Sequence, residues 1–258
     1  PVRSGISDYS AELLPELARF YDIEVVVNQE KVDNATILGS FPTRSAQQFW
    51  QDRHRYDRVV YHFGNSEHHA HMFEMLRVMP GVVVLHDFFI SGLLAHMEGM
   101  RYADGAWVRA LQSAHGWSAV SERYDEQKFE ETVWRYPCNR DVIAQARGVI
   151  VHSHFACELA DIWYGQGTSS DWHVVPMARA RPAAKDREEA RRQLGIGPNT
   201  FLVVSFGVMG PLKLNEELIR AFIDSPLGRD ENTRLVFAGA SGEYGANLLS
   251  QYDEEAEA

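Results

Sequence analysis

Short apolar runs alternate along this chain with longer stretches in which apolar residues recur every three or four positions. The runs are rich in β-branched residues and end at Gly, Pro or charged residues, which is typical of strands buried on both faces of a parallel sheet. The longer stretches predict amphipathic helices between them. The alternation indicates an α/β fold, with strands expected at 23–27, 59–63, 81–85, 148–153 and 172–176. Helices are expected at about 7–21, 66–79 and 154–164, and a further helix is expected to carry Gln47, Phe49 and Trp50.

The chain opens with a Gly-containing segment that leads into the first predicted helix. This is the arrangement that follows the first strand of a doubly wound domain, with Ser7 or Asp8 expected as the helix N-cap. That strand is expected to lie before Pro1, so we interpret the chain as a fragment. Ser153 is placed to cap the helix at 154–164 in the same way.

Residues 88–145 follow a helical, aromatic-rich pattern, with loops expected near 104–105, 115–116 and 136–137. A helical insertion between strands can line or cover an acceptor pocket. It can equally be ordinary core, which is the more common fate of Trp and Tyr at helical spacing. The pattern leaves both interpretations open.

The composition changes at 178–186, where Ala, Arg and Pro occur without an apolar period, as in a linker. A short helix is expected at 187–194, followed by a strand at 201–207, a helix at 214–223 and a strand at 234–239. The predicted organisation is therefore a Rossmann-like domain at 1–178, a linker with a short helix at 179–199, and the start of a second Rossmann-like domain at 200–258. Two strands bury little core, so we expect this second domain to be incomplete.

Composition excludes some classes of protein and leaves others. The chain is 45% hydrophobic and 24% charged with a formal net charge of −11, and its basic residues form no stripe, which argues against nucleic acid as the main partner. A small anionic ligand is not excluded, because it needs only a few backbone amides and one or two cations. Cys138 and Cys157 lack CxxC spacing and indicate reduced thiols in a cytoplasmic protein.

Membrane attachment is limited by the same composition. No run approaches the roughly 20 apolar residues that a membrane span requires, and the first residues carry no signal-peptide pattern. Peripheral association with a membrane surface remains open.

The clearest candidate for chemistry is the polar pair His86 and Asp87 at the end of the predicted strand 81–85. In open α/β sheets ligands bind just outside the carboxyl ends of the strands. The alternative, slightly favoured by these residues alone, is that His86 ends the strand with its ring bonded to a backbone carbonyl.

Several motifs together resemble the GT-B glycosyltransferases of the GT4, group 1 type. In chain order they are PVRSGISDYS at 1–10, YHFGN at 61–65 with His69, VLHD at 84–87, VHS at 151–153, and Phe206-Gly207 with Lys213. The resemblance implies a GT-B-like fold in which two Rossmann-like domains face each other across a cleft. It also implies a retaining transferase that moves a sugar from a UDP- or GDP-linked donor to a hydroxyl of a glycan or lipid-linked acceptor, without a catalytic metal. Such an enzyme would make a polysaccharide or glycoconjugate in the cytoplasm or at the inner membrane face.

The resemblance assigns roles to residues of the first domain. His86 matches the family histidine beside the donor sugar, and Gly5 matches a loop glycine that lets the backbone approach the donor. Asn65 and His69 match a Gly-Asn-x-x-x-His feature on the acceptor side. Asp87 either orients the His86 imidazole or caps the next helix, and capping is the better explanation. The neighbouring His68 is expected to be a solvated helix residue.

In the second domain the resemblance assigns Gly207 and Lys213 to the donor. A diphosphate leaving group gains negative charge as the glycosidic bond breaks, and the Lys213 ammonium would stabilise it. The alternative for Lys213 is a solvated residue at a helix N-terminus. The segment 207–212 lacks the basic residue that family members usually place before this lysine. The expected phosphate site therefore has one positive charge fewer than the family pattern.

The family also holds its donor with two glutamates seven residues apart, late in the second domain. No Glu in the chain has that context, so we expect the 258-residue chain to need the remaining C-terminal half for turnover. A competing hypothesis is a non-catalytic GT-B-like binding module of a larger glycan-assembly protein. A dinucleotide-binding oxidoreductase is disfavoured, because no G-x-G-x-x-G follows a predicted strand.

Overall fold

The computed structural model describes residues 5–29, 32, 34–177, 179, 184 and 186–256. The chain forms two compact units, Pro1–Arg181 and Pro182–Ala258. Both are built from parallel strands that alternate with helices, so the predicted α/β class and Rossmann-like pattern are confirmed. The first four residues and most of the predicted linker at 178–186 lie outside the described residues.

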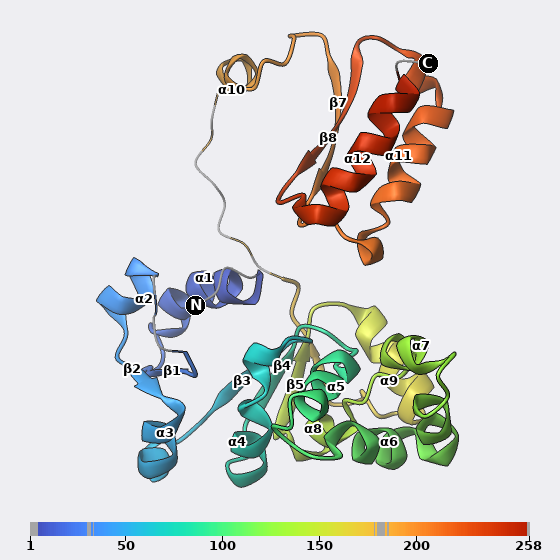
Figure 1. Ribbon diagram of the computed structural model, residues 1–258. Helices are drawn as coiled ribbons and strands as arrows, with labels where there is room; N and C mark the ends of the chain where they lie inside the picture. Colours follow the sequence, from blue (N-terminus) through green and yellow to red (C-terminus); the bar gives the residue numbers. More distant parts are fainter. Residues whose placement is uncertain are drawn as a thin grey trace. The chain divides into compact units, whose positions relative to one another are not determined.

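The first unit is organised around a four-stranded parallel sheet in the order β3-β4-β5-β6. Figure 1 labels β3, β4 and β5, which lie side by side in that order. The strands of this sheet confirm four of the predicted apolar runs in slightly shorter form. Phe63, Val83 and Val151 are fully buried, as expected for strands covered on both faces. The bounds are β3 (Val60–Phe63), β4 (Val82–Leu85), β5 (Gly148–Val151) and β6 (His173–Val174).

Helices separate these strands in the chain and cover the sheet. In place of the single helix expected at 66–79, the structure has a 3-10 turn, η2 (Glu67–His69), and then α4. The predicted helical insertion is real, and its Trp107 is 1% exposed within the main core, which favours the structural interpretation for that aromatic. The helices are α4 (Met72–Val78), α5 (Ser91–Gly99), α6 (Ala106–Arg123), α7 (Phe129–Arg135), α8 (Arg140–Gln145) and α9 (His154–Tyr164).

Two details of these helices differ from the predictions. The loop expected at 115–116 is instead a kink inside α6, where Gly116 leaves helical geometry with φ 82° and ψ −175°. Ser153 occupies the N-cap position of α9, but its side chain makes no capping hydrogen bond.

The N-terminal part of the unit contains a second, two-stranded parallel sheet. The strand predicted at 23–27 is β1 (Val25–Val27), and it pairs with β2 (Thr43–Ser45). Arg44 donates to the Glu24 carboxylate at 3.1 Å and links the two strands. The remaining elements are α1 (Gly5–Leu17), α2 (Ala35–Ser40), α3 (Ala46–Asp52) and η1 (Arg53–Arg55).

The predicted start of the first helix is wrong. α1 already includes Gly5, so Ser7 and Asp8 lie inside the helix and neither is its N-cap. Gly5 is therefore helical, and the loop expected at this position is absent. A Cβ atom built on Gly5 would meet nothing within 4 Å, so the folded chain places no steric demand on this glycine.

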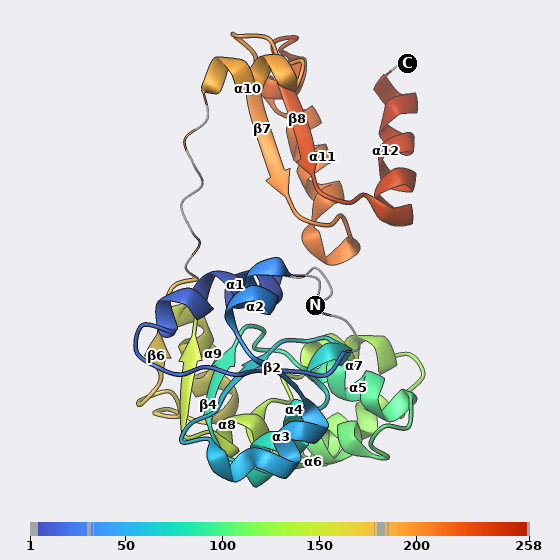
Figure 2. The ribbon, with the colours of Figure 1, turned by 90° about the vertical axis from the view of Figure 1, so that its left-hand side faces the viewer.

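The second unit pairs β7 (Phe201–Phe206) with β8 (Thr233–Ala238) in parallel along their full lengths. Its small core joins Met209, Ile219 and Leu248 to apolar side chains of β8. In Figure 2 α11 lies behind the two strands and α12 stands to their right. Val236 alternates to the face away from this core and is exposed. The other elements are α10 (Arg187–Gln193), η3 (Pro211–Lys213), α11 (Asn215–Asp224), η4 (Pro226–Arg229) and α12 (Gly242–Ala256).

Within the described ranges, no helix combines the length and apolar character needed to cross a bilayer. Cys138 and Cys157 are both free thiols, as predicted, and Cys138 is buried.

Candidate functional site

Three histidines gather at the carboxyl edge of the main sheet. His62 lies in β3, and His86 and His152 are the first residues after β4 and β5. The strand register explains why they meet. His62 pairs with Val84, and Val84 pairs with Ile150. Because side chains two residues apart along a strand share a face, His86 and His152 project from the same face as His62.

The three imidazoles form a continuous hydrogen-bonded chain. His62 Nδ1 lies 3.0 Å from His86 Nε2, and His86 Nδ1 lies 3.0 Å from His152 Nε2. The chain ends at the backbone, where His152 Nδ1 donates to the Val175 carbonyl oxygen at 2.8 Å. The structure therefore differs from the interpretation in which the His86 ring ends the strand bonded to a backbone carbonyl. The backbone carbonyl is bonded to His152, and both ring nitrogens of His86 are engaged by other histidines.

The side chain of Tyr9 from α1 packs against all three rings. Its centroid lies 5.9, 5.0 and 5.2 Å from those of His62, His86 and His152, with edge-on or tilted geometry. Tyr9 is only 3% exposed. Burial, together with the neighbouring histidines, lowers the pKa of His62 to about 4 and that of His86 to about 3. Both rings are therefore neutral near pH 7.

A second group of polar residues lies at the same sheet edge, in the loop after β3. Asp87 Oδ2 accepts a hydrogen bond from the backbone N–H of Asn65 at 2.8 Å, which ties the loop after β3 to the end of β4. A Cβ on Gly64 would lie 3.0 Å from His69 Nε2 and 3.2 Å from Asp87 Oδ2. The structure thus brings together the three residues predicted for the acceptor side, Asn65, His69 and Asp87.

His69 is buried, and its Nδ1 has no hydrogen-bond partner in the described part of the chain. Burial lowers its pKa. The neighbouring His68 is exposed, as predicted.

Asn65 has a structural role that its motif did not indicate. Its Oδ1 accepts a hydrogen bond from Leu93 N at 2.8 Å, in the first turn of α5. The N-cap position of α5 is Ile90, which has no side-chain acceptor, so Asn65 supplies the cap from a distant loop. The capping role predicted for Asp87 is accordingly performed by Asn65.

Replacing Asn65 by Ala should destabilise the first unit by about 1–2 kcal/mol, because an N-terminal amide of α5 loses its acceptor. Asn65→Asp retains the acceptor oxygen and should recover most of the loss. Urea unfolding followed by tryptophan fluorescence measures both variants. Equal stability of Asn65→Ala and the parent chain would contradict the capping role.

In the second unit, Gly207 lies immediately after β7 with φ +127°, a conformation that favours glycine. A Cβ on Gly239, the residue after β8, would lie 2.0 Å from the Gly207 carbonyl oxygen. The two strand ends therefore approach each other through paired glycines. The following loop is anchored by the buried Asn215, whose Oδ1 accepts from Gly210 N at 2.9 Å.

Lys213 is exposed at the end of η3, two residues before α11 begins. It shares the carboxyl side of β7 with Gly207. The intervening Leu214 has φ 52°, so the chain turns sharply between Lys213 and the helix. Lys213 thus lies just before the helix, in agreement with the helix predicted at 214–223.

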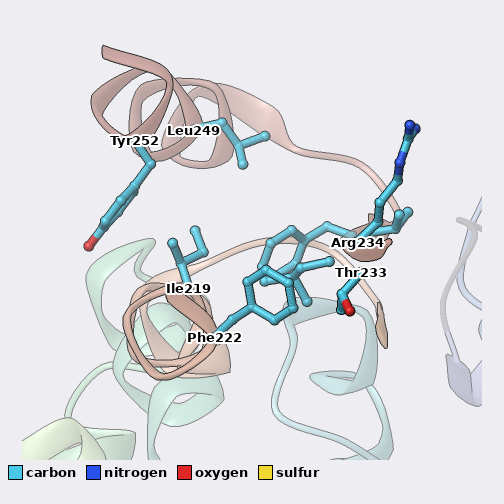
Figure 3. A pocket seen from close by; sticks show the side chains of 9 residues that line it. Ile219, Phe222, Thr233, Arg234, Leu249 and Tyr252 are labelled. Atoms are coloured by element: carbon cyan, nitrogen blue, oxygen red, sulfur yellow. The ribbon is translucent and has the colours of Figure 1, made fainter. Parts of the chain in front are cut away.

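A groove of about 490 Å³ lies elsewhere in this unit. It is lined by side chains of α11 and α12, including Phe222 and Tyr252, and by the consecutive residues 233–237 of β8 (Figure 3). Because consecutive residues of a strand alternate between its faces, the groove follows the edge of β8 rather than one face. Neither Gly207 nor Lys213 lines it.

Neither the local pattern nor the family resemblance predicted a role for His62, His152 or Tyr9. His62 and His152 both lie in the motifs YHFGN and VHS and near strand ends, and these positions are the only indication of a role that the sequence contains. What the pattern lacks is the strand order and register that place them on either side of His86. Tyr9 occupies an ordinary core position of an amphipathic helix.

Within the described residues, no group of three or more His, Cys, Asp or Glu side chains is arranged to hold a metal ion. His62, His86 and His152 are hydrogen-bonded in series, so their ring nitrogens do not converge on a common point. Neither the comparison with protein-family models nor the search of curated proteins finds a match for this sequence.

Proposed function

We propose that this protein is a glycosyltransferase, or part of one, that transfers a sugar with retention from a UDP- or GDP-linked donor to a hydroxyl of a glycan or lipid-linked acceptor. In this proposal it acts in polysaccharide or glycoconjugate synthesis, in the cytoplasm or at the inner membrane face. The ordered motifs resemble GT4 enzymes of the GT-B class, and the parallel α/β units are compatible with such a fold.

The observation that carries the proposal is the position of His86. It lies at the carboxyl edge of a parallel sheet, the region where open α/β sheets bind their ligands. Asn65, His69 and Asp87 lie at the same edge and offer polar contacts for an acceptor.

Two features of the second unit support a diphosphate site in this proposal. Lys213 offers an exposed positive charge, and Gly207 leaves the backbone after β7 without a side chain. A cation at this position would stabilise the negative charge that develops on the leaving diphosphate. Gly210 N is already bonded to Asn215, so the ammonium group of Lys213 has the larger role in this proposal.

One observation favours the alternative of a non-catalytic binding module. Both ring nitrogens of His86 are hydrogen-bonded to other histidines, so neither is available to a sugar hydroxyl unless a hydrogen bond opens. A module would bind its ligand at the sheet edge without turnover.

Titration with UDP- and GDP-linked sugars, measured by calorimetry, tests the proposal. We expect saturable binding by the chain and at least a tenfold weaker affinity for Lys213→Ala, because one charge-assisted contact to the diphosphate is lost. Arg229→Ala is the matched control, since it removes an exposed positive charge of the same unit after the other end of α11.

Equal losses in the two variants would reflect net charge and would argue against a specific diphosphate contact. Absence of binding to every nucleotide sugar, also by a chain extended beyond Ala258, would reject the transferase. Binding without transfer by the extended chain would favour the module.

A further inference from the structure

The hydrogen bonds of the three histidines determine where their protons lie. The Val175 carbonyl oxygen accepts only, so His152 Nδ1 carries a proton. In a neutral ring Nε2 of His152 is then an acceptor, and its partner His86 Nδ1 must donate. By the same step His86 Nε2 is an acceptor and His62 Nδ1 donates. All three rings are therefore Nδ1–H tautomers when neutral.

This assignment leaves one ring nitrogen for exchange with the surroundings. Each of the three hydrogen bonds contains one proton. Together they engage every ring nitrogen of His62, His86 and His152 except His62 Nε2. His62 Nε2 takes part in no hydrogen bond among the described residues and carries a lone pair. While the three bonds persist, a fourth proton can enter only at this atom.

We propose that His62, His86 and His152 form a proton-transfer chain across the carboxyl edge of the main sheet, which takes up a proton at His62 Nε2 from water or a ligand hydroxyl and carries the positive charge to His152. The proposal is independent of the glycosyltransferase function, because solvent can protonate His62 Nε2 as well as a ligand can.

The transfer conserves protons at each step. A proton binds His62 Nε2, and a hydronium ion that donates it is left as water, whereas a ligand hydroxyl that donates it is left as alkoxide. The proton on His62 Nδ1 then moves to His86 Nε2, and the proton on His86 Nδ1 moves to His152 Nε2. At the end His62 and His86 are neutral Nε2–H tautomers, while His152 is protonated on both nitrogens and still donates to Val175.

The surroundings favour charge at the His152 end. Burial opposes a positive charge on His62 and His86, the two rings with lowered pKa. The titratable groups that face them from neighbouring elements are Tyr9 of α1 and His69 of η2, and neither supplies a negative charge at neutral pH. The hydrogen bond of His152 to the Val175 carbonyl is solvent-exposed, and there the charge gains both an acceptor and hydration.

Two-bond ¹H–¹⁵N correlation spectra of the histidine rings in the full chain test the tautomers directly. We expect three Nδ1–H rings at pH 7.5, assigned by single substitution. His152→Asn keeps an amide donor for the Val175 carbonyl but removes the acceptor for His86. His86 should therefore no longer be held in a single tautomer. His62 should lose its fixed tautomer as well, although it does not contact the substituted residue.

His154→Ala, which changes an exposed histidine at the start of α9, is the matched control and should leave all three tautomers unchanged. If His152→Asn does not fold, His152→Ala and the parent spectrum alone still decide the assignment. An Nε2–H ring at His62 or His86 at pH 7.5 would overturn the proposal.

A pH titration of the same spectra tests the transfer. Uptake of the first proton should convert His62 and His86 to Nε2–H tautomers in one step, as His152 becomes doubly protonated. A charged His62 beside an unchanged neutral His152 would refute transfer along the chain.

Discussion

Lowering the pH from 7 to 4 is expected to unfold the first unit of this protein. Five of its histidines have a lowered pKa, and burial is the largest cause for each. His62, His71 and His115 reach about 4 and His86 about 3, while for His69 the direction is downward.

The sign follows from proton uptake. In the unfolded chain these rings titrate near pH 6.5, so between pH 6.5 and 4 the unfolded state binds more protons than the folded state. Stability is complete above the unfolded pKa and is lost as the pH falls towards the folded values. A ring shifted from 6.5 to about 4 contributes up to roughly 3 kcal/mol, and several such rings together rival the 5–15 kcal/mol stability typical of a domain.

The positions of the tryptophans allow the stability of the first unit to be measured separately. All 11 histidines and all six tryptophans precede residue 182, so tryptophan fluorescence reports on the first unit alone. We expect the urea midpoint from fluorescence to fall steeply between pH 6.5 and 4.

Single substitutions identify the groups responsible. His71→Gln should flatten the pH dependence, because the pKa of this half-buried ring is lowered to about 4 and its buried Nδ1 is unpaired in the described part of the chain. His68→Gln, which changes an exposed ring nearby, should leave it unchanged. A midpoint independent of pH over this range would show that the buried rings are already protonated or that they titrate normally.

Replacing Asn139 by Ala is expected to cost the first unit about 3–5 kcal/mol. The Asn139 side chain is completely buried. Its Nδ2 donates to the Phe88 carbonyl oxygen at 2.6 Å, and its Oδ1 accepts from the Tyr164 hydroxyl at 2.5 Å. The substitution removes both bonds and leaves the Phe88 carbonyl and the part-buried Tyr164 hydroxyl without these partners.

This residue also supports the candidate site. Phe88 follows directly after His86 and Asp87, and the Asn139 amide connects that segment to Tyr164 at the end of α9. Urea unfolding by tryptophan fluorescence gives the loss of stability. Tyr164→Phe, which removes one of the two bonds and retains the ring, should cost about 1–2 kcal/mol. A loss below about 1 kcal/mol in Asn139→Ala would show that another group replaces the amide.

The two candidate sites were predictable to different degrees. His86 and Asp87 were candidates because a polar pair directly after a buried strand is a local signal, whereas Lys213 was a candidate only through the resemblance to GT4 enzymes. Asn65 illustrates the limit of such signals. Its motif indicated ligand contact, whereas its side chain caps α5, a helix that begins 26 residues later in the chain.

Errors at element ends have a similar origin. The helix start at Ser7 or Asp8 was inferred from capping preference, but α1 already includes Gly5. Preferences for caps are weak compared with the packing of a whole helix, and here burial of Tyr9 against the histidines accompanies the extended helix. The strand at 23–27 formed as expected, but its partner, β2, was not predicted.

By itself, the sequence determined the alternation of strands and helices, the α/β class and the polar edge after β4. These features follow from local hydrophobic periodicity, which depends only on residues that are close together in the sequence. Only the tertiary structure decided that His62, His86 and His152 form one hydrogen-bonded chain. That arrangement depends on the order and register of β3, β4 and β5, and register is set by packing between residues that are distant in sequence.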